Sequence, residues 1–391
     1  MAQTRRGTTA KQRGTKPGPS RGAPQRQRRG GTSIPPARSE QHPTLPLLRT
    51  SERSTLKKCE WLWDRTYNDF LKPQTDMPAL RFGSLCHVAL AGWYIPGIKR
   101  GVHPAKTFIK AYDAEIARNE EIFGFRVGDD EKWENARDLG KAMMLNYVEE
   151  YGQDSEWKVI ATEMPFRTLV YHPPCTCKSS DFCVCGHRGK EGEPWFCYVG
   201  IVDGVWQNRT SKDIWIPDHK STAGIGDRKM AYLQVDDQAG SYWSWGVDFL
   251  REQGILGPKQ QLAGMLYNFL RKAMPDERPS KIVNGKRMYL NMDGSVSKKQ
   301  PSPYFLRQPI WRDEFDRAEA KHRAMVDYRR IELFRSGELE MTKNPGMFTC
   351  PTCPMRDGCE LHETGNNWEE FLRQTTKTWE PYAEHEVYDG R

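Results

Sequence analysis

The strongest constraint on the fold comes from residues 200–220. Two apolar runs rich in β-branched and aromatic residues, 200–206 and 214–220, flank a short polar turn. This pattern predicts a β-hairpin. Each run nevertheless contains an acidic residue, Asp203 in the first and Asp218 in the second. The hairpin therefore brings ionisable groups into an apolar setting.

Asp218 is followed two residues later by Lys220, so the two side chains share one face of the predicted strand. An apolar hairpin has little reason to direct two carboxylates and an ammonium to one place unless a cation or a reacting group lies there. Oxygen ligands beside a lysine suit a Mg²⁺ or Mn²⁺ site that acts on phosphate. The alternative is a hairpin whose charges are simply solvated.

Two predicted helices carry further polar pairs. Before the hairpin, apolar residues at helical spacing place Gly83 and His87 one turn apart on one face. The glycine leaves room for another backbone or a ligand beside the histidine, although a buried, hydrogen-bonded histidine is the alternative. After the hairpin, Gln238 and Tyr242 are also one turn apart. This pair either contacts a DNA phosphate, braces the lysine, or is a simple polar surface pair.

The order of these motifs resembles the RecB-type branch of the PD-(D/E)xK nuclease superfamily. The motifs are Gly-x-x-x-His ending at His87, Glu163 at the start of a predicted strand, Asp203, Asp-His-Lys ending at Lys220, and Gln-x-x-x-Tyr ending at Tyr242. Residues 266–272 also resemble the strand that this family places after its Gln/Tyr helix. The resemblance covers residues 51–361, and the order and spacing of the motifs are more specific than any single motif.

The resemblance implies an α/β fold with a restriction-endonuclease-like core, in which helices flank a central mixed sheet. It also implies a metal-dependent DNA exonuclease that acts on single strands or DNA ends in recombination, repair or replication. The implied metal ligands are His87, Asp203 and Asp218, with the His219 carbonyl as a further ligand and Glu163 supporting them or holding a second ion. The implied catalytic residues are Asp203, Asp218, Lys220, Gln238 and Tyr242. Lys220 would orient the attacking water or stabilise the growing charge, while Gln238 and Tyr242 would position Lys220 or the DNA.

Three other functions fit the same core. These are a structure-specific endonuclease, a CRISPR-adaptation nuclease, and a non-catalytic iron–sulfur subunit that binds DNA. The last is disfavoured because every expected catalytic position is filled. The sequence contains no Walker A motif, so an NTP-driven motor is not expected. It also identifies no protein partner.

The ten cysteines point to metal sites. The sequence shows no secretory signal or long apolar run, so we expect a cytoplasmic protein without membrane contact, in which clustered cysteines bind metal. Cys350, Cys353 and Cys359 supply three thiolates. In iron–sulfur members of the resembled branch, such as CRISPR-associated exonucleases and AddB, the fourth cysteine lies far upstream, where this chain has Cys59. The resemblance implies a [4Fe–4S] cluster, although Glu60 replaces the usual proline, and the spacing alone equally permits structural Zn²⁺.

A second cysteine-rich segment interrupts the predicted core at residues 173–192. Proline and glycine flank it, which indicates a loop leaving the sheet. Its candidate ligands are Cys175, Cys177, Cys183, Cys185 and His187. We expect a small Zn²⁺ knuckle, with a flexible loop of free thiols as the alternative.

The excess of basic over acidic residues lies in an N-terminal tail, 1–45. Its first 40 residues carry ten Lys or Arg against one acid, whereas the whole chain has a net charge of +8. Such a tail is expected to be disordered, and either contacts nucleic acid non-specifically or only aids solubility. The predicted segments that follow are a helical part 46–152, the nuclease core 153–311, a helix with the last cysteines 312–362, and an extension 363–391. Apolar residues at helical spacing predict helices at 61–71, 80–93, 105–119, 131–151 and 232–250, and a long charged helix is expected at 312–336.

Overall fold

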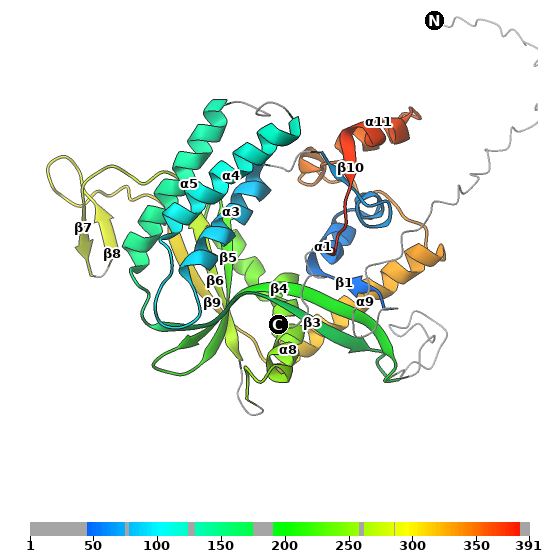
Figure 1. Ribbon diagram of the computed structural model, residues 1–391, viewed down its shortest axis with the longest axis horizontal. Coiled ribbons are helices and arrows are strands. Elements are labelled where there is room, and N and C mark those ends of the chain that lie inside the picture. Colours follow the sequence, from blue (N-terminus) through cyan, green and yellow to red (C-terminus); the bar gives the residue numbers. More distant parts are fainter. Residues whose placement is uncertain are drawn as a thin grey trace, which may run out of the picture. The chain divides into compact units, whose positions relative to one another are not determined.

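A computed structural model of the chain is shown in Figure 1. It describes residues 45–74, 78–123, 130–174, 191–257, 262–284 and 286–383, which all fall within one compact unit. The basic tail and the candidate zinc ligands Cys175, Cys177, Cys183, Cys185 and His187 lie outside the described residues. None of the helices in the described part is both long and apolar enough to span a membrane.

A six-stranded mixed sheet forms the centre of the structure. Its strands are β1 (Leu47–Leu48), β3 (Trp157–Tyr171), β4 (Pro194–Asn208), β5 (Ile214–Thr222), β6 (Leu262–Arg271) and β9 (Phe305–Trp311). Strand β4 pairs antiparallel with β3 and, at its start, parallel with β1. Strand β5 pairs parallel with β6, which pairs antiparallel with β9. The predicted hairpin is therefore β4–β5, and the predicted α/β fold with a mixed sheet is confirmed.

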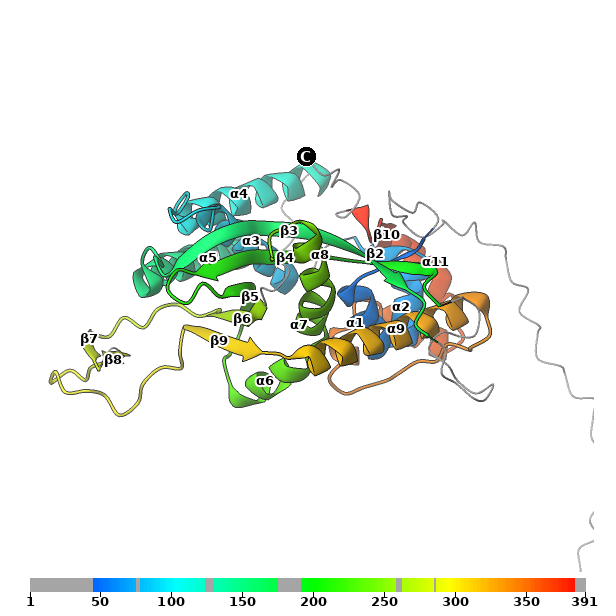
Figure 2. The same cartoon turned by 90° about the horizontal axis from the view of Figure 1, so that it is seen from below.

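Helices cover both faces of this sheet (Figure 2). One layer comprises α3 (Pro78–Trp93), α4 (Pro104–Phe123) and α5 (Asp130–Tyr151), and the other comprises α7 (Asp237–Ser241), α8 (Val247–Glu252) and α9 (Glu314–Ser336). On β5, Ile214 and Ile216 pack in the core on the α7–α9 side, whereas Trp215 packs on the α3–α5 side. Because side chains alternate along a strand, Asp218 and Lys220 face the same layer as Ile214 and Ile216, which is the layer of α7, α8 and α9.

The helix predicted at 232–250 is interrupted. The segment consists of α6 (Asp227–Tyr232), a 3₁₀ turn (Leu233–Val235), α7, a π-helical turn (Tyr242–Gly246) and α8. At the break, Asp236 has an extended backbone and its side chain accepts a hydrogen bond from the Gln238 N–H. This is an N-cap, which satisfies one of the free amides at a helix start. The interruption fixes where the Gln/Tyr motif begins.

Segments from the two ends of the described chain pack together. The N-terminal segment consists of α1 (Thr50–Lys58), α2 (Glu60–Trp63), a π-helical turn (Asp64–Asn68) and β2 (Leu71–Pro73), and the C-terminal segment consists of α10 (Arg356–Glu363), α11 (Trp368–Thr375) and β10 (Thr376–Thr378). Residues of α2 pack against α11, and β2 pairs with β10. The helix expected to run to Leu71 therefore ends earlier, since Leu71 begins β2. The sequence did not predict the β2–β10 pairing, α11, or the hairpin β7 (Ser280–Val283) to β8 (Lys286–Tyr289).

Candidate active site

The candidate site lies in a fork between β4 and β5. These strands pair over only two residues each, next to the hairpin turn, and then diverge. Backbone groups that face the gap need partners other than a strand ladder. The carboxylate of Asp203 accepts a hydrogen bond from the His219 N–H at 2.6 Å, and the Ile201 carbonyl accepts one from the Tyr242 hydroxyl at 2.7 Å. The fork thus holds Asp203 and Asp218 inside the protein, where both side chains are buried.

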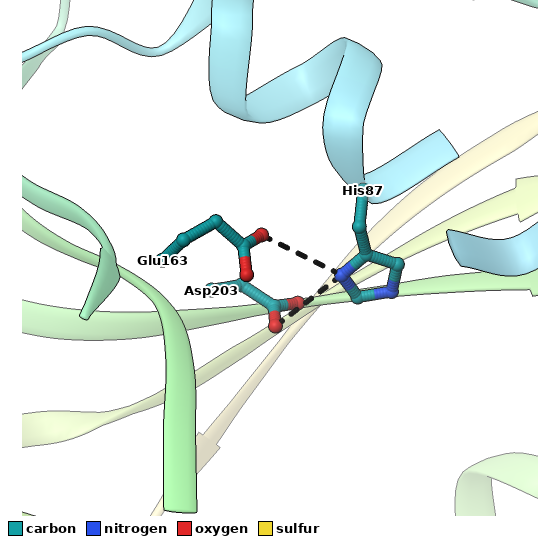
Figure 3. Close-up of side chains that lie close together, drawn as sticks. All are labelled: His87, Glu163 and Asp203. Atoms are coloured by element: carbon teal, nitrogen blue, oxygen red, sulfur yellow. Dashed lines mark ion pairs between the residues drawn. The ribbon is translucent and has the colours of Figure 1, made fainter. Parts of the chain in front are cut away.

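Three side chains from three elements meet in the fork (Figure 3). His87 comes from α3, Glu163 from β3 and Asp203 from β4. The Nδ1 atom of His87 lies 3.4 Å from Oδ1 of Asp203 and 3.8 Å from Oε1 of Glu163. The potential ligand atoms of all three residues lie within 4.8 Å of one another. Carboxylate oxygens with one imidazole nitrogen form a donor set that suits Mn²⁺ and is compatible with Mg²⁺.

Glu163 occupies an unusual backbone position within this group. It lies in the middle of β3, not at the start of a strand as predicted, and its φ angle is +43°. Its neighbours Thr162 and Met164 pair with the residues on either side of Asp203. A left-handed conformation at a non-glycine residue costs about 1–3 kcal/mol. The backbone is therefore strained at the point where Glu163 reaches Asp203 and His87.

A second chain of contacts starts at the buried carboxylate of Asp218. The Nζ atom of Lys220 lies 2.9 Å from both oxygens of this carboxylate and 2.6 Å from Oε1 of Gln238. Gln238 Nε2 donates to the Tyr242 hydroxyl at 2.8 Å. Only the contact with Oδ1 of Asp218 has hydrogen-bond geometry, so Oδ2 lacks a hydrogen-bond partner among the described residues. The structure thus connects all four of these candidate residues.

The pKa shifts indicate an excess of negative charge. Burial would lower the pKa of His87, but the carboxylates of Asp203 and Glu163 outweigh it and raise the pKa to about 10. Burial raises the pKa of Asp218, and the charge of Asp203 adds to this effect despite the opposing influence of Lys220. A bound cation would neutralise the same excess. The donor set and its electrostatics therefore fit a divalent metal ion.

A buried polar network that the sequence analysis missed surrounds His219 of β5 and Asn268 of β6. Nδ2 of Asn268 lies 2.8 Å from Nδ1 of His219 and 2.9 Å from the Tyr147 hydroxyl, which is 2.8 Å from the Tyr94 hydroxyl. Arg307 also donates to Tyr147, at 3.0 Å. Burial lowers the pKa of His219 to about 3, so this histidine is neutral. The available signal was Asn268, a polar residue within an apolar strand sequence.

A buried ion-pair network attaches α1 to the helix that carries Gln238. The Arg53 side chain is 1% exposed and lies 2.7 Å from the Asp327 carboxylate and 3.3 Å from that of Asp237. Lys57, one turn later on α1, lies 2.6 Å from Asp237. Because Asp237 directly precedes Gln238, the position of α1 constrains the residue that contacts Lys220.

The cysteines predicted to bind a cluster line one cavity of about 310 Å³. They are Cys59, Cys350, Cys353 and Cys359. Cys59 has an extended backbone between α1 and α2, which separates the two helices. The Gly346 N–H donates to the Cys350 sulfur at 3.3 Å. Among the described residues, the group of His, Cys or acidic ligand atoms close enough to hold a metal ion is that of His87, and the four cysteines are brought together only as the lining of this cavity. The other two described cysteines, Cys86 and Cys197, are buried, as expected for packed core residues.

Residues 50–360 match the family model of the PD-(D/E)XK nuclease superfamily. The chain belongs to this superfamily. The matched region contains the fork, the His87 group and the Asp218–Lys220 contact. A comparison with curated proteins gave no match. The superfamily consists of nucleases that generally use divalent metals, so the chain is a nuclease-type hydrolase with DNA as its substrate.

Proposed function

We propose that this nuclease is a metal-dependent DNA exonuclease of the RecB-type branch, acting on single strands or DNA ends. The observation that carries the proposal is the contact of Lys220 with both Asp218 and Gln238, beside the His87 group. The order of motifs along the chain supports the assignment to the RecB-type branch.

In this proposal the metal is held by His87, Asp203 and Asp218, together with the His219 carbonyl, and Glu163 supports this set. When bound, the ion supplies Lewis-acid polarisation of the scissile phosphate and lowers the pKa of a bound water. The protein's own contribution is to position the ligand side chains and to keep the Asp203 carboxylate and the Lys220 ammonium ionised. Burial of Asp203 and Asp218 strengthens the electrostatic contacts that these two carboxylates make.

Lys220 stabilises the charge that develops on the phosphate. Burial alone would lower the pKa of this lysine, but Asp218 and Asp203 outweigh it and raise the pKa, so the ammonium stays charged. Gln238 orients the ammonium without neutralising it. Tyr242 fixes Gln238 and is itself held by the Ile201 carbonyl. A preorganised cation directed at developing charge is an effective catalytic device.

We also propose that Cys59, Cys350, Cys353 and Cys359 hold a [4Fe–4S] cluster. The four residues line a single cavity of about 310 Å³. Four thiolates also permit a structural zinc ion. The position of Cys59 far upstream of the other three cysteines, as in iron–sulfur members of the resembled branch, supports the cluster. The cluster would join the residue between α1 and α2 to the segment that contains α10, and so restrict the unfolded state.

The test is digestion of end-labelled, single-stranded DNA by the purified protein with Mg²⁺ or Mn²⁺. We expect linear strands to be degraded and circular single strands of the same sequence to resist. Cleavage of linear and circular strands at equal rates would contradict the exonuclease proposal and indicate an endonuclease. Lys220→Ala protein purified by the same procedure is the control for contaminating nucleases. Wild-type protein without activity on any DNA would contradict the proposal.

A further inference from the structure

Two cations at the end of β6, Arg271 and Lys272, form no ion pair with a carboxylate in the described part of the chain. Arg271 is the last residue of β6 and pairs with Thr222, the last residue of β5. The N–H of the next residue, Lys272, donates to the Thr222 carbonyl at 2.7 Å. Neither cation forms an ion pair with a described residue, and the Nε atom of Arg271 is buried without a hydrogen-bond partner in that part of the chain. Both positive charges therefore remain available to an anion.

Aromatic rings hold these two side chains in place. The guanidinium carbon of Arg271 lies 4.3 Å from the ring centre of Tyr304, and Nζ of Lys272 lies 5.6 Å from that of Phe82. A cation–π contact orients a cation but leaves its charge uncompensated. Arg307 provides a contrast within the same sheet, because it also stacks on a ring but is paired with a carboxylate. The ends of β5 and β6 thus carry preorganised cations that no described carboxylate neutralises.

These cations lie close to the candidate active site. Thr222 is two residues beyond Lys220 on β5, a rise of roughly 7 Å. In the β5–β6 register, Lys220 pairs with Phe269 and Thr222 with Arg271, so Lys220 and Arg271 point to the same face.

Lys272 approaches from the other layer. It lies over Phe82 of α3, the helix that carries His87. A Cβ atom on Gly83 would lie only 3.5 Å from the Ser221 hydroxyl, so α3 packs closely against the end of β5 at this point. Arg271 therefore lies on the face of the sheet that carries Lys220, and Lys272, one residue past the end of β6, reaches the helix that carries His87.

We propose that Arg271 and Lys272 form a second phosphate-binding subsite, which holds the phosphate next to the scissile one in a DNA strand. The inference rests on the proposed nuclease function. A strand carries one charged phosphate per nucleotide, so a scissile phosphate beside Lys220 brings its neighbour towards this strand end. The faces of Tyr304 and Phe82 are covered by the cations, which leaves the phosphate as the recognised group. The subsite positions the strand and reads no base sequence.

The decisive substrate is a set of oligonucleotides in which one phosphate at a time is replaced by a neutral methylphosphonate. With wild-type protein, neutralising the phosphate next to the cleaved one should raise KM roughly tenfold or more, with kcat changed less than about threefold. With the double variant Arg271→Gln/Lys272→Gln, KM is already raised and the same neutral position should add no further effect. Equal sensitivity of both proteins at that position would overturn the subsite.

Three controls separate this role from a structural one. Lys272→Arg keeps the charge and should retain most of the wild-type affinity, whereas Lys281→Gln removes an exposed charge on β7 and should change nothing. Binding of uncleaved DNA should show a salt dependence shallower by about 0.7 in log–log slope for the double variant, as expected for one lost phosphate contact on a single strand. Because this measurement needs no cleavage, an unchanged slope would overturn the subsite even if the proposed exonuclease activity stands. An inactive wild-type protein would contradict only the proposed function.

Discussion

The ammonium of Lys220 lies 2.6 Å from the side-chain oxygen of Gln238, although 18 residues separate them in the chain. On its other side the ammonium contacts the buried carboxylate of Asp218. One neighbour is charged and the other is neutral, so the lysine is fixed in direction while part of its charge remains available. Tyr242 completes the arrangement by donating to the Ile201 carbonyl, which faces the β4–β5 fork.

Replacing Lys220 should remove catalysis while leaving the fold intact. We expect Lys220→Ala to lower kcat by about 10²–10³ or more, because a cation at the developing charge is lost. Gln238→Ala should cost less, about tenfold, since the lysine keeps Asp218. Single-turnover digestion of end-labelled DNA measures both, and fluorescence anisotropy checks that DNA binding survives. Wild-type rates from carefully purified Lys220→Ala protein would refute the assigned site.

Activity should require a divalent cation and should be at least as high with Mn²⁺ as with Mg²⁺. The reason is the imidazole of His87, a nitrogen ligand that Mn²⁺ accepts more readily. His87→Ala should therefore weaken Mn²⁺ binding, which calorimetry measures. It should also reduce the difference between the activity with Mn²⁺ and the activity with Mg²⁺. Full activity after exhaustive treatment with EDTA would contradict a metal mechanism. Unaltered Mn²⁺ affinity of His87→Ala would return the histidine to a packing role.

The stability of the metal-free protein should rise with pH in the acidic range because of His219. Its folded pKa is about 3, whereas an unfolded histidine titrates near 6.5. Between these values the unfolded state binds a proton that the folded state does not, so the free energy of unfolding increases with pH. The contribution of one residue is at most about 1.4 kcal/mol per pH unit. Urea denaturation of wild type and His219→Gln at several pH values tests this, and parallel pH profiles would exclude His219 as the cause.

Protein purified without oxygen should be brown and contain iron. The cavity lined by Cys59, Cys350, Cys353 and Cys359 is the proposed location. Cys353→Ser should lose the colour and the iron, and should also lower the thermal midpoint, because the link between the terminal segments is gone. Elemental analysis and visible absorption measure the effect. Stoichiometric zinc in colourless wild-type protein would favour the structural zinc alternative.

Removal of residues 1–40 should weaken DNA binding without changing the chemistry. This segment holds ten basic residues and one acidic residue, while the whole chain has a net charge of +8. Each phosphate contact it makes should release counterions, so the truncated protein should show a shallower salt dependence and the same rate at saturating DNA. Matching salt slopes for the two proteins would leave the tail with a solubilising role only.

Local patterns in the sequence predicted much of the fold. The two apolar runs, each containing one acid, identified the β4–β5 hairpin, and helical spacing identified α3, α4, α5 and α9 close to their observed limits. These elements have strong periodicity and bury one face, so their pattern follows directly from packing. The short strands β2 and β10 form through contacts with distant segments, and no local signal marks them. Helix α11 did carry a usable signal in Asn367, whose side chain caps the start of the helix.

The candidate site was predicted less completely, for physical reasons. The sequence indicated Glu163 but not its left-handed backbone, which depends on pairing between β3 and β4. It did not indicate the divergence of β4 from β5, because the residues beyond the turn are apolar in both strands. The break before Gln238 had a usable signal in Asp236, an acid well suited to cap a helix. Arg53, at the far end of the network that supports Gln238, resembles any charged helix residue until its partners are known.

The contacts between α1 and the C-terminal segment impose an order on the synthesis of this protein. Glu52 accepts a hydrogen bond from Tyr382, which follows it by 330 residues. Strand β2 likewise pairs with β10, so this pairing cannot form until β10 has been synthesised. The first helix therefore leaves the ribosome long before the residues that cover it exist. A chain terminated before Tyr382 leaves the carboxylate of Glu52, fully buried in the folded protein, without one of its donors. Synthesis of the chain through Tyr382 is thus a condition for burying the α1 segment that supports Gln238.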